Sequence, residues 1–134
     1  MMADTSSEKP RPPKQTVLII DDARTTRTHM RLMLEALFEC HTASSAEEGL
    51  QLARTHRPQA ILLDVQMPGM NGLECLAVLK TDPDLKKIPV VMVTTRGEEE
   101  AIRRAEALGC NAYVAKPVQS AELFTTLRTL LRVD

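Results

Sequence analysis

Charged and hydroxyl side chains follow directly after four of the apolar stretches in this sequence. These side chains belong to Asp21, Asp22, Asp64, Thr94, Thr95 and Lys116. An apolar run bounded by turn residues is typical of a strand that is buried on both faces. In open parallel sheets, ligands bind outside the carboxyl ends of the strands. We therefore expect these side chains to meet in one crevice if their strands are neighbours.

The three carboxylates and their companions suit phosphoryl chemistry. At ~5 Å and an effective dielectric of ~20, each pair of carboxylates among Asp21, Asp22 and Asp64 repels by about 3 kcal/mol, which favours a proton or a bound cation. Oxygen ligands with open water positions suit Mg²⁺. Lys116 adds a fixed positive charge and Thr94 a hydroxyl, so that phosphoryl oxygens find partners and an aspartate can act as the nucleophile.

Each of these residues also has an ordinary structural explanation when it is taken alone. Asp21 and Asp22 are common types at the start of a helix, and Asp64 precedes a turn. Thr94 suits a strand because it is β-branched, and Lys116 suits a solvated loop. The joint placement at the ends of four apolar runs is what favours a functional site.

The elements that must position these residues can be predicted from apolar periodicity and turn signals. We expect strands at 16–20, 40–43, 59–64, 88–93 and 112–115, and helices at 24–38, 46–55, 71–80, 98–108 and 120–132. In the first helix Leu37 completes an inward stripe, and Ser45 to Glu48 reads as a capping box for the second. Strands that alternate with helices predict a parallel sheet covered on both faces.

Composition limits the classes of function. The 134 residues suit one domain at 16–134, preceded by a polar, proline-containing tail at 1–15 that we expect to be disordered. The net charge of −1 gives no footprint for nucleic acid or for a membrane surface. The sequence shows no membrane span and no secretory signal, and its three isolated cysteines favour a reduced, cytoplasmic protein.

The order and spacing of these residues resemble the receiver domain of two-component response regulators, the CheY-like family. The resemblance extends over about residues 16–132. It implies a flavodoxin-like, doubly wound sheet of five parallel strands in the order 2-1-3-4-5, with five helices. The residues that carry it are Ile20-Asp21-Asp22, Leu63-Asp64-Val65-Gln66-Met67-Pro68-Gly69-Met70-Asn71-Gly72, Val93-Thr94 and Tyr113-Val114-Ala115-Lys116-Pro117.

The resemblance also implies a metal site and a phosphoacceptor. Asp64 would accept the phosphoryl group. Asp22, Asp64 and the backbone carbonyl of Gln66 would bind Mg²⁺ directly, with Mn²⁺ as a substitute, and Asp21 would bind it mostly through water. Lys116 would bond to the phosphoryl oxygens.

Further residues of the family pattern concern switching and lifetime. Thr94 would follow the phosphoryl group, and Tyr113 would move inward when Thr94 moves. Gln66 and Arg96 correspond to positions that tune the lifetime of the phosphorylated state. The peptide bond of Lys116–Pro117 would be cis.

These features imply a single-domain response regulator that is not an enzyme, although it assists its own phosphorylation and dephosphorylation. A sensor histidine kinase or histidine phosphotransfer protein would be the donor. A downstream protein target would bind the face formed by the fourth helix, fifth strand and fifth helix. Two alternatives stay open: a receiver that binds partners independently of phosphorylation, or a fragment of a larger regulator or hybrid kinase.

Two other classes fit the sequence less well. A flavin or nucleotide binder of the same fold would use aromatic stacking and a phosphate loop rich in Ser, Thr and Gly, whereas this chain has no Trp, one Tyr and two Phe. An aspartyl phosphatase dependent on Mg²⁺ would carry a DxD pattern after the first strand, where this chain has adjacent Asp21 and Asp22.

Overall fold

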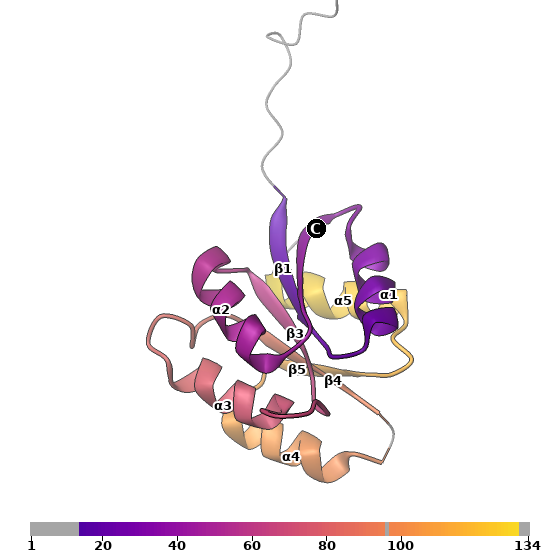
Figure 1. The fold of residues 1–134 in the computed structure, drawn as a ribbon. Helices are drawn as coiled ribbons and strands as arrows, with labels where there is room; N and C mark the ends of the chain where they lie inside the picture. Colours follow the sequence, from indigo (N-terminus) through magenta and orange to yellow (C-terminus); the bar gives the residue numbers. More distant parts are fainter. Residues whose placement is uncertain (1–13, 96, 132–134) are drawn as a thin grey trace, which may run out of the picture.

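Five strands alternate with five helices in the part of the chain that the computed structural model describes, residues 14–95 and 97–131 (Figure 1). The strands are β1 (Gln15–Ile20), β2 (Phe38–Ala43), β3 (Ala60–Asp64), β4 (Val90–Thr94) and β5 (Ala112–Ala115). The helices are α1 (Arg24–Leu34), α2 (Ala46–His56), α3 (Gly72–Thr81), α4 (Glu99–Leu108) and α5 (Ser120–Leu131). All strand pairs are parallel, in the order β2-β1-β3-β4-β5, which confirms the predicted flavodoxin-like sheet.

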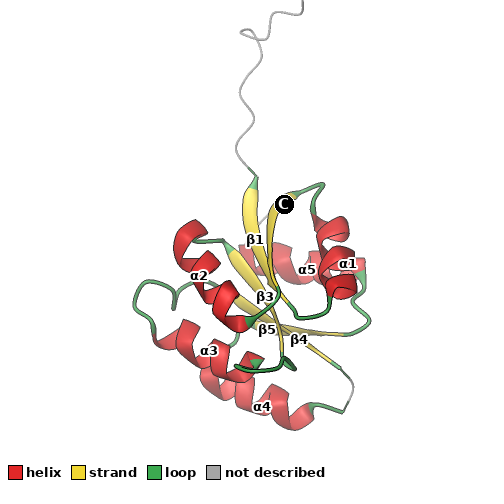
Figure 2. Cartoon of the chain, in the orientation of Figure 1, coloured by secondary structure: helices red, strands yellow, loops and turns green. Residues whose placement is uncertain are grey.

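Helices cover both faces of the sheet (Figure 2). Helices α1 and α5 lie on one face, where Met30 and Leu127 are fully buried. Helices α2, α3 and α4 lie on the other face and bury Leu50, Leu76 and Ala105. The sheet therefore separates two apolar cores, and its central strands meet apolar side chains on both sides.

Side chains of the central strands alternate between these two cores. In β1, Val17 and Ile19 point toward α1 and α5, whereas Leu18 and Ile20 point toward the other helices. In the pairing of β1 with β3, Ile20 lies beside Leu63. The next residue in both strands is an aspartate, so that the register places two carboxylates side by side at one edge of the sheet.

Two helices next to this edge begin with side-chain caps. Asn71 and Glu74 form a reciprocal capping box at the start of α3. At the start of α2, the Ser45 side chain accepts a hydrogen bond from the Glu48 N–H as predicted, but the Glu48 carboxylate bonds to Ser44 instead of completing a box with Ser45. The chain turns so that the Ser44 N–H and hydroxyl both point at that carboxylate.

The predicted end of the first helix is wrong. Helix α1 stops at Leu34 instead of residue 38, and Leu37 is 54% exposed instead of facing inward. Phe38 is only 4% exposed, begins β2 and packs in the core beside α1 and α5. Leu37 fits the helical spacing, but burying the larger ring of Phe38 in an extended strand decides where the helix ends.

The tail predicted at 1–15 falls mostly outside the described residues, although Gln15 already belongs to β1. Among residues 14–95 and 97–131, no helix combines the length and apolar composition that crossing a membrane would need.

Candidate functional site

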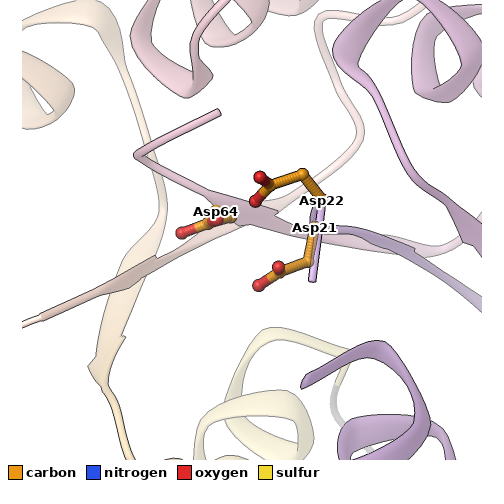
Figure 3. A group of neighbouring side chains, drawn as sticks. All are labelled: Asp21, Asp22 and Asp64. Carbon is orange, nitrogen blue, oxygen red and sulfur yellow. The ribbon is translucent and has the colours of Figure 1, made fainter. Parts of the chain in front are cut away.

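Three carboxylates converge at the carboxyl edge of the sheet (Figure 3). Asp21 and Asp22 follow β1 and Asp64 ends β3, and a carboxylate oxygen from each lies within 4.8 Å of the others. Asp21 is fully buried and Asp64 is 4% exposed, whereas Asp22 is open to solvent. The structure therefore brings together the acidic residues that the sequence predicted, and Asp22 lies on the solvent side of the cluster.

The Lys116 ammonium lies among the buried carboxylates. Its Nζ is 3.1 Å from Asp64 Oδ1 and 3.2 Å from Asp21 Oδ2. Lys116 comes from the loop after β5, two strands away from β3. Asp64 has the strand parity of Leu62, which faces α1 and α5, and the Lys116 ammonium reaches it from the loop after β5.

Local hydrogen bonds fix the position of Asp21. Its Oδ1 accepts the Ala23 N–H at 2.8 Å, and Arg27 Nη1 donates to its backbone carbonyl at 2.8 Å. Arg27 lies one turn into α1, and no signal in the sequence indicates this contact because an arginine on a helix surface is common. The guanidinium ties the start of α1 to the end of β1.

The charges in this cluster perturb one another. Burial raises the pKa of Asp64 to about 6, the Asp21 carboxylate adds to this effect, and Lys116 and the Gln66 N–H oppose it. Burial alone would lower the pKa of Lys116, but the two carboxylates raise it above its usual range. Lys116 is therefore a permanent cation, whereas Asp64 gains a proton in mildly acidic solution.

The acidic cluster has the donor set of a hard divalent cation. Asp21 Oδ2 is buried and accepts no well-aligned hydrogen bond within the described residues, although the Lys116 ammonium is nearby. Two nearly buried carboxylates and one exposed carboxylate leave a net negative charge after one lysine is counted. Asp21, Asp22 and Asp64 therefore fit Mg²⁺, which prefers a few carboxylate oxygens and retained water.

Thr94 ends β4 beside this cluster. It is 2% exposed, and its carbonyl accepts the Lys116 N–H at 2.6 Å. The register of β3 with β4 pairs Asp64 with Val93, so that Thr94 follows at the level of the acidic cluster. The threonine is thus fixed through its backbone to the loop that carries the lysine.

The loops after β3 and β4 form a rim held by Glu98, a residue that is absent from the predicted functional set. Its Oε2 accepts a hydrogen bond from Gln66 Nε2 at 2.8 Å. Its Oε1 accepts the Thr95 N–H at 2.7 Å and the Thr95 hydroxyl at 2.6 Å. Thr95 lies three residues before Glu98, at the spacing of a capping box, but the bond from Gln66 comes from a different loop and leaves no signal in the sequence.

Gly72 fixes the loop after β3 against the strand. Its N–H donates to the Val65 carbonyl at 2.9 Å. A Cβ at this position would lie 2.0 Å from the Asp64 carbonyl oxygen and 2.8 Å from the Val65 Cα. Only glycine allows this close approach, which holds the backbone of Asp64 in place.

The remaining predicted residues lie in different surroundings. Tyr113, on β5, is 48% exposed and points away from the core. The peptide bond between Lys116 and Pro117 is cis. Gln66 lies at the rim, where its side chain bonds to Glu98. Arg96 lies outside the described residues.

Comparison with known families identifies the class of protein to which this fold and acidic cluster belong. A family model described as "Response regulator receiver domain" matches residues 17–128. The chain belongs to this family of two-component signalling proteins.

Individual relatives support the same conclusion. The chain is similar to the polar-differentiation response regulator DivK of Brucella anthropi, with 37% identity over 121 residues that cover 87% of this chain and 96% of the relative. A putative response regulator structure from Chloroflexus aurantiacus has a TM-score of 0.85 and 32% identity, and covers 90% of this chain and 99% of its own. Vibrio cholerae CheY4, a chemotaxis protein, has a TM-score of 0.82 and 30% identity, with coverage of 87% and 98%.

Proposed function

We propose that this receiver accepts a phosphoryl group on Asp64 in a reaction that depends on Mg²⁺. The donor is the phosphohistidine of a sensor histidine kinase or of a histidine phosphotransfer protein. The modified receiver then changes its affinity for a downstream protein. The proposal keeps the cytoplasmic location expected from the sequence, and the receiver assists its own phosphorylation without turning over an external substrate.

One observation carries this proposal. A nearly buried carboxylate, Asp64, lies 3.1 Å from a lysine ammonium and within one cluster with two further carboxylates. Asp64 can act as a nucleophile, Lys116 can neutralise phosphoryl oxygens, and the acidic pair can hold a cation. No simple structural role requires all of these groups at the same edge of the sheet.

The transfer step follows from this arrangement. An Asp64 carboxylate oxygen attacks the phosphorus, a P–O bond forms, and the P–N bond to the donor imidazole breaks with its electron pair left on nitrogen. Mg²⁺ would be held by Asp22, Asp64 and the backbone carbonyl of Gln66, with Asp21 mostly through water, and would supply positive charge to the transferring oxygens. Lys116 moves its ion pair from the Asp64 carboxylate to a phosphoryl oxygen, and the Thr94 hydroxyl donates to another.

The proposed output depends on movements of Thr94 and Tyr113 after phosphorylation. Movement of Thr94 toward the phosphoryl group vacates space near β5, and Tyr113 turns inward from its exposed position. The face formed by α4, β5 and α5 then presents a different surface to the downstream protein. This is a population shift between two packings, driven by a local charge.

Intact mass spectrometry tests the acceptor role. The full chain is incubated with acetyl phosphate, with Mg²⁺ or with EDTA, and compared with Asp64→Asn. We expect a gain of one phosphoryl mass that requires Mg²⁺ and is lost in the variant. If wild type gains no phosphoryl mass from acetyl phosphate or from a phosphohistidine donor, the proposal is wrong.

A further inference from the structure

One carboxylate at the rim of the site receives three hydrogen bonds. Glu98 accepts from the Gln66 amide, the Thr95 N–H and the Thr95 hydroxyl, at 2.8, 2.7 and 2.6 Å. These donors come from the loop after β3 and the loop after β4, which flank the acceptor. Burial alone would raise the pKa of Glu98, but the bonds from Thr95 and Gln66 and the charge of Lys116 lower it. Glu98 is therefore an anion in this arrangement.

The donors on Glu98 are of the kind that would also bind a phosphoryl group. Backbone N–H, hydroxyl and amide groups make strong bonds to anionic oxygens. Gln66 lies two residues after Asp64, and Thr95 follows Thr94 at the edge of the sheet. The donors of Gln66 and Thr95 are thus already bonded to an internal anion before any anion arrives on Asp64.

We propose that Glu98 is a positioning residue that competes with the phosphoryl group for the donors of Thr95 and Gln66, and so holds the receiver in its unphosphorylated state. This inference rests on the proposed acceptor role of Asp64. The negative charge of Glu98 also opposes the approach of a second anion. Phosphorylation must displace the carboxylate before the donors can turn to the new oxygens.

Displacement of Glu98 connects the site to α4. Glu98 is the residue that immediately precedes this helix, and its side chain makes no cap to the helix itself. A surface cavity of about 320 Å³ lies beside the hydrogen bond between Gln66 and Glu98. It is lined in part by Gln66, Asn71, Glu98, Ala101 and Arg104. The cavity gives the released carboxylate room to move, so that loss of the rim contact is transmitted to the first turn of α4.

The test uses beryllofluoride with Mg²⁺ as a tetrahedral anion probe and acetyl phosphate as the donor. The variants are Glu98→Ala, Glu98→Gln and the matched control Glu99→Gln, an exposed acid in the next position. We expect Glu98→Ala to bind beryllofluoride and to gain phosphoryl mass about fivefold more readily than wild type, with a smaller gain in Glu98→Gln and none in the control.

Nuclear magnetic resonance separates this mechanism from a general structural effect. The Thr95 amide resonance of wild type should move when beryllofluoride binds, and the same resonance should already be displaced in free Glu98→Ala. If wild type accepts the anion and Glu98→Ala behaves like wild type or like Glu99→Gln, the inference about Glu98 is overturned. The acceptor role of Asp64 is not affected by that result. Wild type that accepts neither beryllofluoride nor a phosphoryl group overturns the acceptor role as well.

Discussion

The site has two regions that are built differently. Its floor consists of Asp21, Asp64 and Lys116, whose side chains are largely buried and follow directly from strands. Its rim consists of Gln66, Thr95 and Glu98, which lie on loops and are partly or fully exposed. The floor is fixed by sheet register, whereas the rim is held by a few side-chain hydrogen bonds.

We assign the acceptor chemistry to the floor and the control of the response to the rim. The sheet fixes the backbone from which the floor side chains extend, so that in the proposed transfer only side chains such as the Lys116 ammonium would change partners. Rim contacts in solvent are individually weak and can exchange partners at little cost. A receiver needs both properties, since the acceptor must be constant and the response must be reversible.

The largest expected effect comes from disturbing the backbone of the floor. Gly72→Ala should destabilise the protein by about 3 kcal/mol, because the new Cβ meets backbone atoms of Asp64 and Val65 that cannot give way. The rim control is Gly97→Ala, at a φ of +87° with open space around it, which should cost about 1 kcal/mol. Urea denaturation measures both, and equal losses would contradict the contrast between floor and rim.

A smaller effect on stability should follow from removing the buried negative charge of Asp64. Its pKa is raised to about 6 in the folded protein and returns to 3.8 on unfolding, so that the native state binds more protons between these values. The contribution of Asp64 to wild-type stability therefore falls as pH rises from about 4 to 6. In EDTA, Asp64→Asn should be more stable than wild type by about 2 kcal/mol at neutral pH, and this advantage should vanish near pH 4.

Denaturation curves at several pH values, all in EDTA, measure this difference. An advantage of the variant that does not depend on pH would show that packing, and not the buried charge, is responsible. If wild type is more stable than Asp64→Asn at neutral pH, the raised pKa of Asp64 is contradicted.

The smallest effect concerns the metal. Mg²⁺ at about ten times its dissociation constant should stabilise wild type by about 1 kcal/mol at neutral pH, because it binds only the folded acidic cluster. The gain should be smaller at pH 5, where a proton on Asp64 competes with the cation. Thermal melts with Mg²⁺ or EDTA measure the gain. A similar gain in Asp64→Asn would place the bound cation elsewhere.

Much of the fold could be predicted from the chain because its physical causes are local. Continuous apolar runs at β3 and β4 reveal strands buried on both faces, and Gly109 ends α4 in the left-handed conformation expected for that position. The end of α1 could not be predicted, because Leu37 and Phe38 compete for the core and only packing decides between them.

Rim contacts were hidden from the sequence for a related reason. Glu98 resembles any acid at the start of a helix, and its role depends on Gln66, which is 32 residues away along the chain. Arg27 likewise resembles a solvated helix residue until the carbonyl of Asp21 is seen beside it. Such contacts are set by how loops meet in space, and no periodicity records them.

The sequence by itself determined which apolar runs form strands, and which acid, hydroxyl and lysine follow them. Only the tertiary structure decided that Lys116 contacts both Asp21 and Asp64, and that Glu98 occupies the donors at the rim. The physical reason is range. Strand formation and its alternation depend on neighbouring residues, whereas the distances between charges depend on register, crossover connections and the packing of loops that are remote in the chain.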